Sequence, residues 1–423
     1  MKMAGMMKVV ACGVVLASLA LVSGNAEART LEEILKEKGV ITAEDYAEVV
    51  KSNPFKYEPG KGLTVTSAEG NSSMNIGGWG QLLYTYTDKD SQSSDDVSDF
   101  DIKRIKLVFQ GHVFSKNLGY RYIGDLSSGF RTEDALLFYK FAEPLVLQVG
   151  QFVPPQSRQE MTSSARQFFV ERSLANDTFN LGRDQGLQAA GNFADKLVEY
   201  KLGIFNGNGP NTSNPDNRHM YAGRLDLNPL GAYAMDEAGW PSDKPLLNLG
   251  GSFAWNKVGA NDVGGGFDRD NDVMDVALDL DKTRYTGTAG KDNFITDYGK
   301  ELTWLLWTAN INATWLGANF AAEYFNLNAD PDLGKDWDAD GYYVQAGYQI
   351  LPNTLDVGVR YSEIKSDDAN ASAKFDKSET QLGVNYYFKK HNLKLQGDYT
   401  WVNDDMTKDR DDQIARLQVQ FYF

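Results

Sequence analysis

Basic side chains stand at alternate positions in several amphipathic stretches, and they are the residues best placed to do chemistry. In DFDIKRIKLVFQG, residues 99–111, Ile105 and Leu107 share one face while Arg104 and Lys106 share the other. A period of two indicates a β-strand with one apolar and one polar face. Basic groups around an enclosed polar space favour the passage of anions. The pattern therefore indicates that the basic groups attract anions and favour their passage.

Further basic residues fall on this polar face when the other clear strands are interpreted in the same way. They are Lys201, Arg224, Arg360, Lys394 and Arg416. The acids on the same faces are Glu199, Asp226, Asp356 and Asp398. With Arg104 and Lys106 included, seven basic groups stand against four carboxylates. We interpret the excess as selection of anions; the alternative is that each charge only neutralises a neighbour across the wall.

The long connection at 153–182 adds four arginines. They are Arg158, Arg166, Arg172 and, just after its end, Arg183. Arginine suits phosphate or carboxylate because its planar guanidinium donates two parallel hydrogen bonds. The alternative is that some of these arginines fasten the connection to carboxylates such as Glu160 or Glu171.

Residue types that support catalysis are scarce. The three histidines, His112, His219 and His391, have no metal-binding neighbour at a useful spacing. The sequence contains no nucleophile elbow, P-loop or dinucleotide-binding fingerprint. We therefore expect neither an enzyme nor a cofactor or metal.

Strands that alternate from Ser73 onward must position the basic groups. LVEYKLGIF (197–205), TLDVGVRYSEI (354–364) and NLKLQGDYTWV (392–402) all show the pattern. Strands of soluble proteins average about 5–6 residues. The segments here run about 9 to 12 residues, which suits a tilted strand that crosses a bilayer. With a mean hydropathy of −0.43, helical membrane spans are not expected.

The connections alternate between short and long, as in outer-membrane barrels. The short ones are 114–117, 142–144, 194–196, 351–353 and 389–391, with 229–246 unusually long for that side. The long ones are 88–99, 153–182, 207–217, 257–300, 328–339, 366–377 and 403–411. Counting VMDVALDL (273–280) as a strand gives seventeen strands and places the termini on opposite sides. Assigning it to a loop gives sixteen, with both ends periplasmic, and this is our prediction: an all-β, transmembrane antiparallel barrel over 70–423.

The N-terminal region has a different pattern. Residues 1–28 have a basic start, an apolar run and the small-residue end AEA, which is typical of a cleaved secretory signal. Cys12 lies inside the apolar run, so we exclude lipidation, and the mature chain has no cysteine. Two capping boxes, Thr30 with Glu33 and Thr42 with Asp45, predict two short helices. Residues 29–69 are thus a periplasmic helical segment and linker.

Negative charge is concentrated in the predicted outer loops. The formal charge of −16 becomes about −17 without Lys2, Lys8 and Glu27, so nucleic acid is not an expected partner. DRDND (268–272) and DWDADG (336–341) space carboxylates two apart, as calcium loops do. Neither has a twelfth-position glutamate, and we interpret both as solvated loops.

The chain ends on RLQVQFYF, residues 416–423, within a clean alternation. We expect this strand to pair with the first, SMNIGGWGQLLYTYT, because unpaired backbone groups in lipid cost several kcal/mol each. Phe423 then lies on the lipid face at the periplasmic rim. A terminal phenylalanine in this setting resembles the signal that bacterial barrel-assembly machinery recognises.

Residues 149–191 resemble the phosphate-selective porin O and P family through GQF, TSS, ER and GRDQGLQ. DFDIKRIKLVFQG resembles that family's second strand, and LGVNYYF and RLQVQFYF resemble its ending. The resemblance covers about residues 70–423. It implies an outer-membrane porin of a Gram-negative bacterium, a homotrimer, with 153–182 folded inward to narrow the pore.

The resemblance is less complete at the phosphate site. Phosphate-selective members carry two adjacent arginines where this chain has Lys103 and Arg104. They carry other basic residues where it has Trp79, Gln151 and Met161.

We therefore expect passive diffusion of small anions, phosphate among them, through a constriction lined by Arg and Lys. The expected surroundings are outer-membrane lipid and lipopolysaccharide. The alternatives are a weakly selective general porin, a barrel that sheaths a redox partner such as a cytochrome, and a secreted all-β binding module.

Overall fold

The computed structural model describes most of the chain. The described residues are 35–42, 44, 54–90, 95–263, 287–366, 375–405 and 411–423. The predicted signal, both capping boxes, VMDVALDL and DRDND lie wholly or partly outside them. Residues 35–37 and 44 are helical. Among the described residues, no helix has the length and apolarity needed to cross a membrane.

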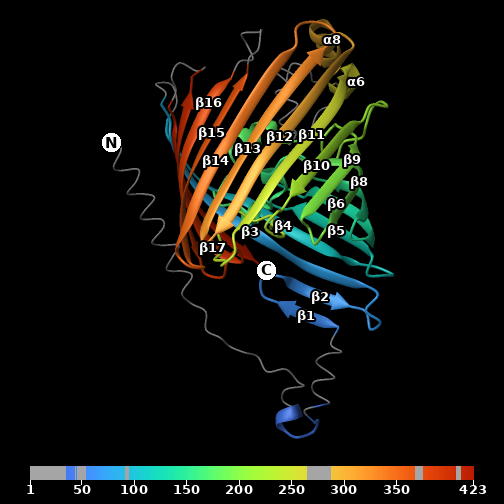
Figure 1. The fold of residues 1–423 in the computed structure, drawn as a ribbon, viewed down its shortest axis with the longest axis vertical. Coiled ribbons are helices and arrows are strands. Elements are labelled where there is room, and N and C mark those ends of the chain that lie inside the picture. The colour runs from blue at the N-terminus through green and yellow to red at the C-terminus, as the bar shows by residue number, and fades with distance from the viewer. Residues whose placement is uncertain are drawn as a thin grey trace.

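Sixteen of the described strands form a closed antiparallel barrel (Figure 1). They are β3 (Ser73–Asp88), β4 (Val97–His112), β5 (Leu118–Asp125), β6 (Arg131–Ala142), β7 (Leu145–Phe152), β8 (Asp184–Phe193), β9 (Val198–Phe205), β10 (Met220–Leu227), β11 (Leu246–Gly259), β12 (Glu301–Trp315), β13 (Ala318–Pro331), β14 (Trp337–Leu351), β15 (Leu355–Ser366), β16 (Asp376–Tyr387), β17 (Leu393–Asp404) and β18 (Gln413–Tyr422). Each pairs with the next, and β18 pairs with β3 from Gln413↔Asp88 to Tyr422↔Trp79. The predicted sixteen-stranded barrel is confirmed.

The closure explains why the chain ends on an aromatic strand. The backbone of Phe423 exchanges two hydrogen bonds with Gly78, at 3.1 and 3.2 Å. Phe421 and Phe423 lie on the outer face, where their rings occupy the space above Gly80 and Gly78. Tyr422 points to the interior. The last strand is thus fully paired down to its final residue.

The two faces of the wall differ as a membrane barrel requires. Outward residues are large and exposed, for example Leu305, Trp307 and Ile311 on β12. Inward residues are polar and buried; the side-chain amides of Asn310 and Asn312 both donate to Oδ1 of Asn248. The polar groups inside the wall therefore bond to one another.

The wall is uneven in height. β5, β7, β9 and β10 have 8 residues each, whereas β12 and β14 have 15. On the tall side the predicted loop 328–339 is wrong, because β13 continues to Pro331 and β14 begins at Trp337. DWDADG is therefore mostly strand, and Asn328 bonds to Asp338 across it at 2.6 Å. Polar pairs extend the ladder beyond the apolar band.

Short elements cap the two ends of the barrel. β1 (Phe55–Glu58) and β2 (Gly62–Thr66) form a hairpin that pairs with the start of β3, near the C-terminus (Figure 1). Its tip contacts the turn after β16, where Gly60 leaves no room for a side chain beside Asn392. At the opposite end, α6 (Ala260–Val263) and α8 (Gly287–Tyr298) stand above β11 and β12.

Residues 153–182 cross the barrel interior and lie against β13–β18. They contain α4 (Arg158–Met161), the 3-10 helix η1 (Ser164–Arg166) and α5 (Leu174–Phe179). Backbone amides donate to wall side chains: Arg158 N to Glu323 at 2.8 Å, Ala175 N to Ser362 at 3.0 Å and Val170 N to Asp398 at 3.0 Å. We call this segment the inner loop.

Glycines in the wall provide the space for the aromatic residues of the inner loop. A Cβ atom at Gly358 on β15 would lie 2.6 Å from the Phe168 ring, and one at Gly383 on β16 would lie 2.8 Å from the Phe169 ring. Both rings are at most 2% exposed. Because these glycines have no side chains, the aromatic rings of the inner loop can pack directly against the backbone of the wall.

The first prediction tests this seat. Gly358→Val should displace Phe168 and destabilise the packing of the inner loop against the wall by about 1–3 kcal/mol, the usual cost of overpacking. Single-channel recordings should show larger and noisier conductance. Gly397→Val is the matched control, since a Cβ atom there meets nothing closer than 3.6 Å. If Gly358→Val gave the same conductance and noise as the wild type, the packing of Phe168 against Gly358 would not hold the inner loop in place.

Candidate functional site

Three consecutive cavities lie between the inner loop and the wall formed by β3–β9. Their volumes, from the side of the long connections to the periplasmic side, are about 380, 410 and 490 Å³. Neighbouring cavities share lining residues; the middle and periplasmic ones share Trp79, Arg121, Ile123 and Ser163. We call this series of cavities the passage.

Lys103 and Arg104 both reach the passage although they are adjacent in the sequence. Gln81 pairs with Arg104 and Leu82 with Ile102, so Lys103 is the extra residue of a β-bulge. Both cations approach Glu171 of the inner loop: Lys103 forms an ion pair, and Arg104 Nη2 lies 3.6 Å from Oε2. The bulge thus doubles the positive charge at this level.

A second bulge places two carboxylates on β6, two strands along the wall from β4. Ile123 pairs with Asp134 and Gly124 with Thr132, which makes Glu133 the extra residue on β6. Glu133 and Asp134 are both less than 7% exposed. They are the acids around which the cations of this wall are arranged.

Three cations surround this acidic pair. Arg183 lies 2.9 Å from Asp134 and 3.2 Å from Glu133. Arg121 lies 2.7 Å from Asp134, and Lys106 contacts both Glu133 and Asp125. Each carboxylate is therefore shared between cations, which leaves donor capacity on the guanidinium groups that border the passage.

The inner loop contributes charges of both signs. Arg172 Nε lies 3.1 Å from Glu160. The Asp177 side chain is exposed to the passage but lies deep inside the barrel. This burial, and then the nearby Glu171, raise its pKa to about 6. Burial acts to raise the pKa of Glu171 as well, but Arg104 and Lys103 together hold it below its usual value. Both carboxylates are thus mostly ionised at neutral pH, and Asp177 takes up a proton at a higher pH than Glu171.

Positive charge prevails in the two upper cavities. Eight basic residues line them: Lys103, Arg104, Lys106, Arg121, Arg131, Arg172, Arg183 and Lys201. Five acids line them: Asp125, Glu133, Asp134, Glu160 and Asp177. Counting Glu171 as a sixth still leaves an excess of two positive charges among the described residues.

Four of the basic residues predicted to line the pore hold the inner loop instead. Arg158, Arg224, Arg360 and Lys394 are each at most 4% exposed. Arg360 donates to the carbonyl oxygens of residues 171 and 172 at 2.8 and 3.0 Å, and Lys394 donates to that of Gln167 at 3.1 Å. These side chains therefore bind the backbone of the inner loop. Strand alternation cannot distinguish such buried positions from positions open to water.

Arg224 and Arg158 share the carboxylate of Asp226. Arg224 grips it through two bonds of 2.7 Å and also donates to the Gln156 carbonyl at 2.8 Å. Arg158 Nη1 lies 3.8 Å from the same carboxylate.

The other predicted residues have mixed surroundings. Arg416 pairs with Asp398 at 3.1 Å beneath the inner loop. Lys201 faces the middle cavity and lies 3.4 Å from the Met161 sulfur. The side chain of Arg166 is exposed.

The long periplasmic turn at 229–246 folds into the barrel and meets the inner loop. Both carboxylate oxygens of Glu237 accept hydrogen bonds, from Phe168 N at 2.8 Å and from Gln159 Nε2 at 3.0 Å. Arg158 Nη2 donates to the Ala234 carbonyl at 2.8 Å. The inner loop is thus held from the periplasmic side as well as by the wall.

The same turn is anchored to the wall at the periplasmic end. Asp236 accepts from His391 at 2.9 Å and from Trp240 Nε1 at 3.1 Å. Burial lowers the pKa of His391, so at neutral pH a largely neutral ring donates this hydrogen bond. His391 therefore has a structural partner.

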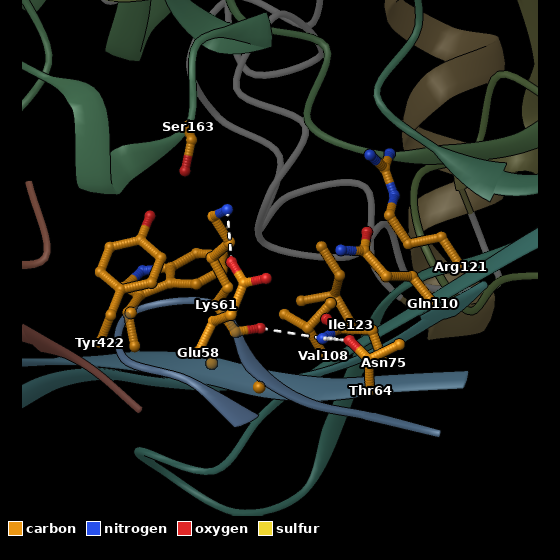
Figure 2. Close-up of a pocket in the computed structure, with 14 residues that line it drawn as sticks. Glu58, Lys61, Thr64, Asn75, Val108, Gln110, Arg121, Ile123, Ser163 and Tyr422 are labelled. Carbon is orange, nitrogen blue, oxygen red and sulfur yellow. Dashed lines mark hydrogen bonds and ion pairs between the residues drawn. The ribbon is translucent and has the colours of Figure 1, made fainter. Parts of the chain in front are cut away.

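The periplasmic cavity differs in character from the two above it (Figure 2). Val108 and Ile123 give it an apolar floor, and the Tyr422 ring lies at one side with Arg121 at the other. Glu58 and Lys61 of the β1–β2 hairpin enter it as an ion pair of 2.6 Å. This is where the hairpin borders the passage.

Several of these residues were not predicted. Arg121 could have been found, because GYRYIGD alternates like the other strands. Glu133 and Asp134 could not, since a bulge leaves no trace in the alternation. Glu237 was signalled only by the unusual length of its turn. Among the described residues, no group of His, Cys, Asp and Glu has the arrangement of a metal site.

Comparison with known proteins gives one family. The profile of the family described as "Phosphate-selective porin O and P" matches residues 74–423. An uncharacterized protein of Aquifex aeolicus (strain VF5) is 25% identical over 444 residues, which cover 94% of this chain and 96% of the relative.

Solved structures share the fold at low identity. An anion-selective porin from Comamonas acidovorans has a TM-score of 0.58 at 12% identity, covering 84% of this chain and all of that one. The outer membrane channel DcaP of Acinetobacter baumannii has 0.54 at 13%, with coverages of 85% and 99%. OmpT of Vibrio cholerae, in a trimer form, has 0.51 at 13%, with 84% and 100%.

The second prediction concerns the turn. Glu237→Ala removes both acceptors and leaves the buried Phe168 amide without its partner, at a cost of about 1–3 kcal/mol. We expect a looser inner loop, seen as increased open-channel noise in planar bilayers. Glu143→Ala, in an exposed periplasmic turn, is the control. Equal noise in the two variants would mean that the turn does not support the inner loop.

Proposed function

Because the chain belongs to the phosphate-selective porin O and P family and is an outer-membrane porin of a Gram-negative bacterium, we propose that it conducts small anions by passive diffusion. The route is the passage between the inner loop and β3–β9. The observation that carries the proposal is the excess of basic over acidic side chains along this route.

The proposed mechanism is a relay between cations. An anion meets Lys103 and Arg104 first, then Lys106, Arg183 and Arg121. Each step exchanges part of the hydration shell for charged hydrogen bonds, which are stronger than neutral ones. The carboxylates that share these cations keep binding weak enough for release, as conduction requires.

Strong preference for phosphate is not part of the proposal. Trp79, Gln151 and Met161 stand where phosphate-selective relatives have basic residues. Gln151 is occupied in bonds to the carbonyls of Thr132 and Glu133, and Met161 places a thioether in the middle cavity. We expect a modest preference for anions in general.

The redox-sheath alternative receives no support from the interior. A folded partner would have to occupy the space where the inner loop and the turn at 229–246 contact β13–β18. The three cavities of the passage are each below about 500 Å³, on the scale of small ligands.

We also propose a homotrimer. β5, β7, β9 and β10, with 8 residues each, are shorter than the about 9–11 residues of a membrane-crossing strand. The shortness of these strands favours cover by neighbouring subunits on this side, where the outer face carries exposed Leu147, Leu202 and Leu225. Residues 1–28 as an export signal and Phe423 as an assembly signal complete the proposal.

The third prediction tests anion preference at Arg104. Arg104→Glu reverses a charge beside Glu171; two unit charges at about 4 Å interact by roughly 4 kcal/mol at an effective dielectric of 20. About 1.4 kcal/mol of that would change ion occupancy tenfold. The reversal potential under a salt gradient should move toward cation preference, and less so in 1 M salt, where screening tightens to about 3 Å.

Asp96→Lys, on an exposed outer segment, is the charge-reversing control and should move the potential much less. If Arg104→Glu left the reversal potential unchanged, Arg104 would lie outside the route of the ions.

A further inference from the structure

An apolar patch inside the passage is unexpected, because the interior of a membrane barrel is ordinarily polar. The three strands β3, β4 and β5 present it in register. Val108 pairs with Gly77 on one side and Ile123 on the other. All three face the periplasmic cavity. A bare inorganic ion gains nothing from such a surface.

An aromatic pair adjoins the patch. Trp79, one step further along β3, stacks on Tyr422 with ring centres 5.7 Å apart and an interplanar angle of 27°. Trp79 lines both the middle and the periplasmic cavities. Its indole N–H is shielded from solvent and has no hydrogen-bond partner in the described part of the chain. The residue offers a flat apolar face where the middle and periplasmic cavities meet.

A cation stands on the other side of the apolar patch. Arg121 pairs with Gln110 across β4 and β5, and its guanidinium reaches Asp134, the partner of Ile123 on β6. The guanidinium thus lies level with Ile123. Trp79 is one rung away along the strands, about 7 Å, and two strands away across the wall, about 10 Å, so a ligand that meets both residues must lie across Val108 and Ile123. Its side chain is 43% exposed, so it retains donors for a ligand.

We propose that Trp79, Val108, Ile123 and Arg121 form a subsite for organic anions that carry a planar apolar body. The ring lies against Trp79 and the aliphatic pair, and the carboxylate or phosphate group meets Arg121. Ligand sites of this kind combine apolar walls with a few placed polar groups. The inference rests on the proposed anion conduction and names the substrate class of that passage.

Block of chloride current in planar bilayers tests the subsite in the mature protein. Benzoate is the probe; acetate has the same charged group without a ring, and gluconate has a polar body. Benzoate should block at about tenfold lower concentration than either, the order expected from stacking on an aromatic face. Equal block by benzoate and acetate would overturn the subsite.

Variants at Trp79 assign the effect to the ring. Trp79→Gln should raise the half-blocking benzoate concentration to that of acetate, whereas Trp79→Phe should keep most of the preference. Trp79→Arg should shift block from benzoate toward inorganic phosphate. Trp315→Gln, at the exposed edge of the outer face, is the matched control, and benzoate should block this variant at the same concentration as the wild type. Unchanged benzoate block in Trp79→Gln would place the ring elsewhere.

The same bilayers separate this inference from the proposed function. If the reversal potential of the wild type showed a preference for cations, both the proposed anion conduction and the subsite would be overturned. Anion preference without any preference for benzoate would overturn the subsite alone.

Discussion

A segment that runs through the interior of a barrel must find a hydrogen-bond partner for its backbone amides and carbonyls, and this constraint organises the structure. The inner loop meets it with side chains of the wall rather than with its own secondary structure, which is limited to three short helical turns. Glu323 and Asp398 accept from its amides, while Arg360 and Lys394 donate to its carbonyls. Charged groups are suited to this task because their hydrogen bonds are stronger than those of neutral groups.

The seating of the inner loop divides the interior into two unlike halves. On β13–β18, polar side chains and glycines are covered, and the turn carrying Glu237 completes the support from below. On β3–β9, the wall stays open and its charges face the passage. The same residue type therefore does two jobs: Arg360 fastens the backbone, whereas Arg183 and Arg121 share carboxylates beside the route of the ions.

Alternation was enough to predict the barrel, its closure through β18 and the side of the wall on which most basic residues lie. It could not predict which of them the inner loop covers, because Arg104 and Arg360 occupy equivalent positions in their strands. Bulges were also invisible: the extra residue at Lys103 shifts the register without changing the composition. The interior role of Glu237 depends on a turn folding inward, which only its length suggested.

Chemical accessibility of two cysteine variants tests most directly where the passage runs. The only cysteine, Cys12, lies in the predicted signal, so single cysteines can be introduced into the mature chain. An anionic thiosulfonate reagent should modify Arg121→Cys quickly and reduce the current. It should leave Ser362→Cys unmodified, since Ser362 is fully buried and bonded to Ala175 of the inner loop. Equally fast modification of Ser362→Cys would contradict the seating of the inner loop and with it the one-sided passage.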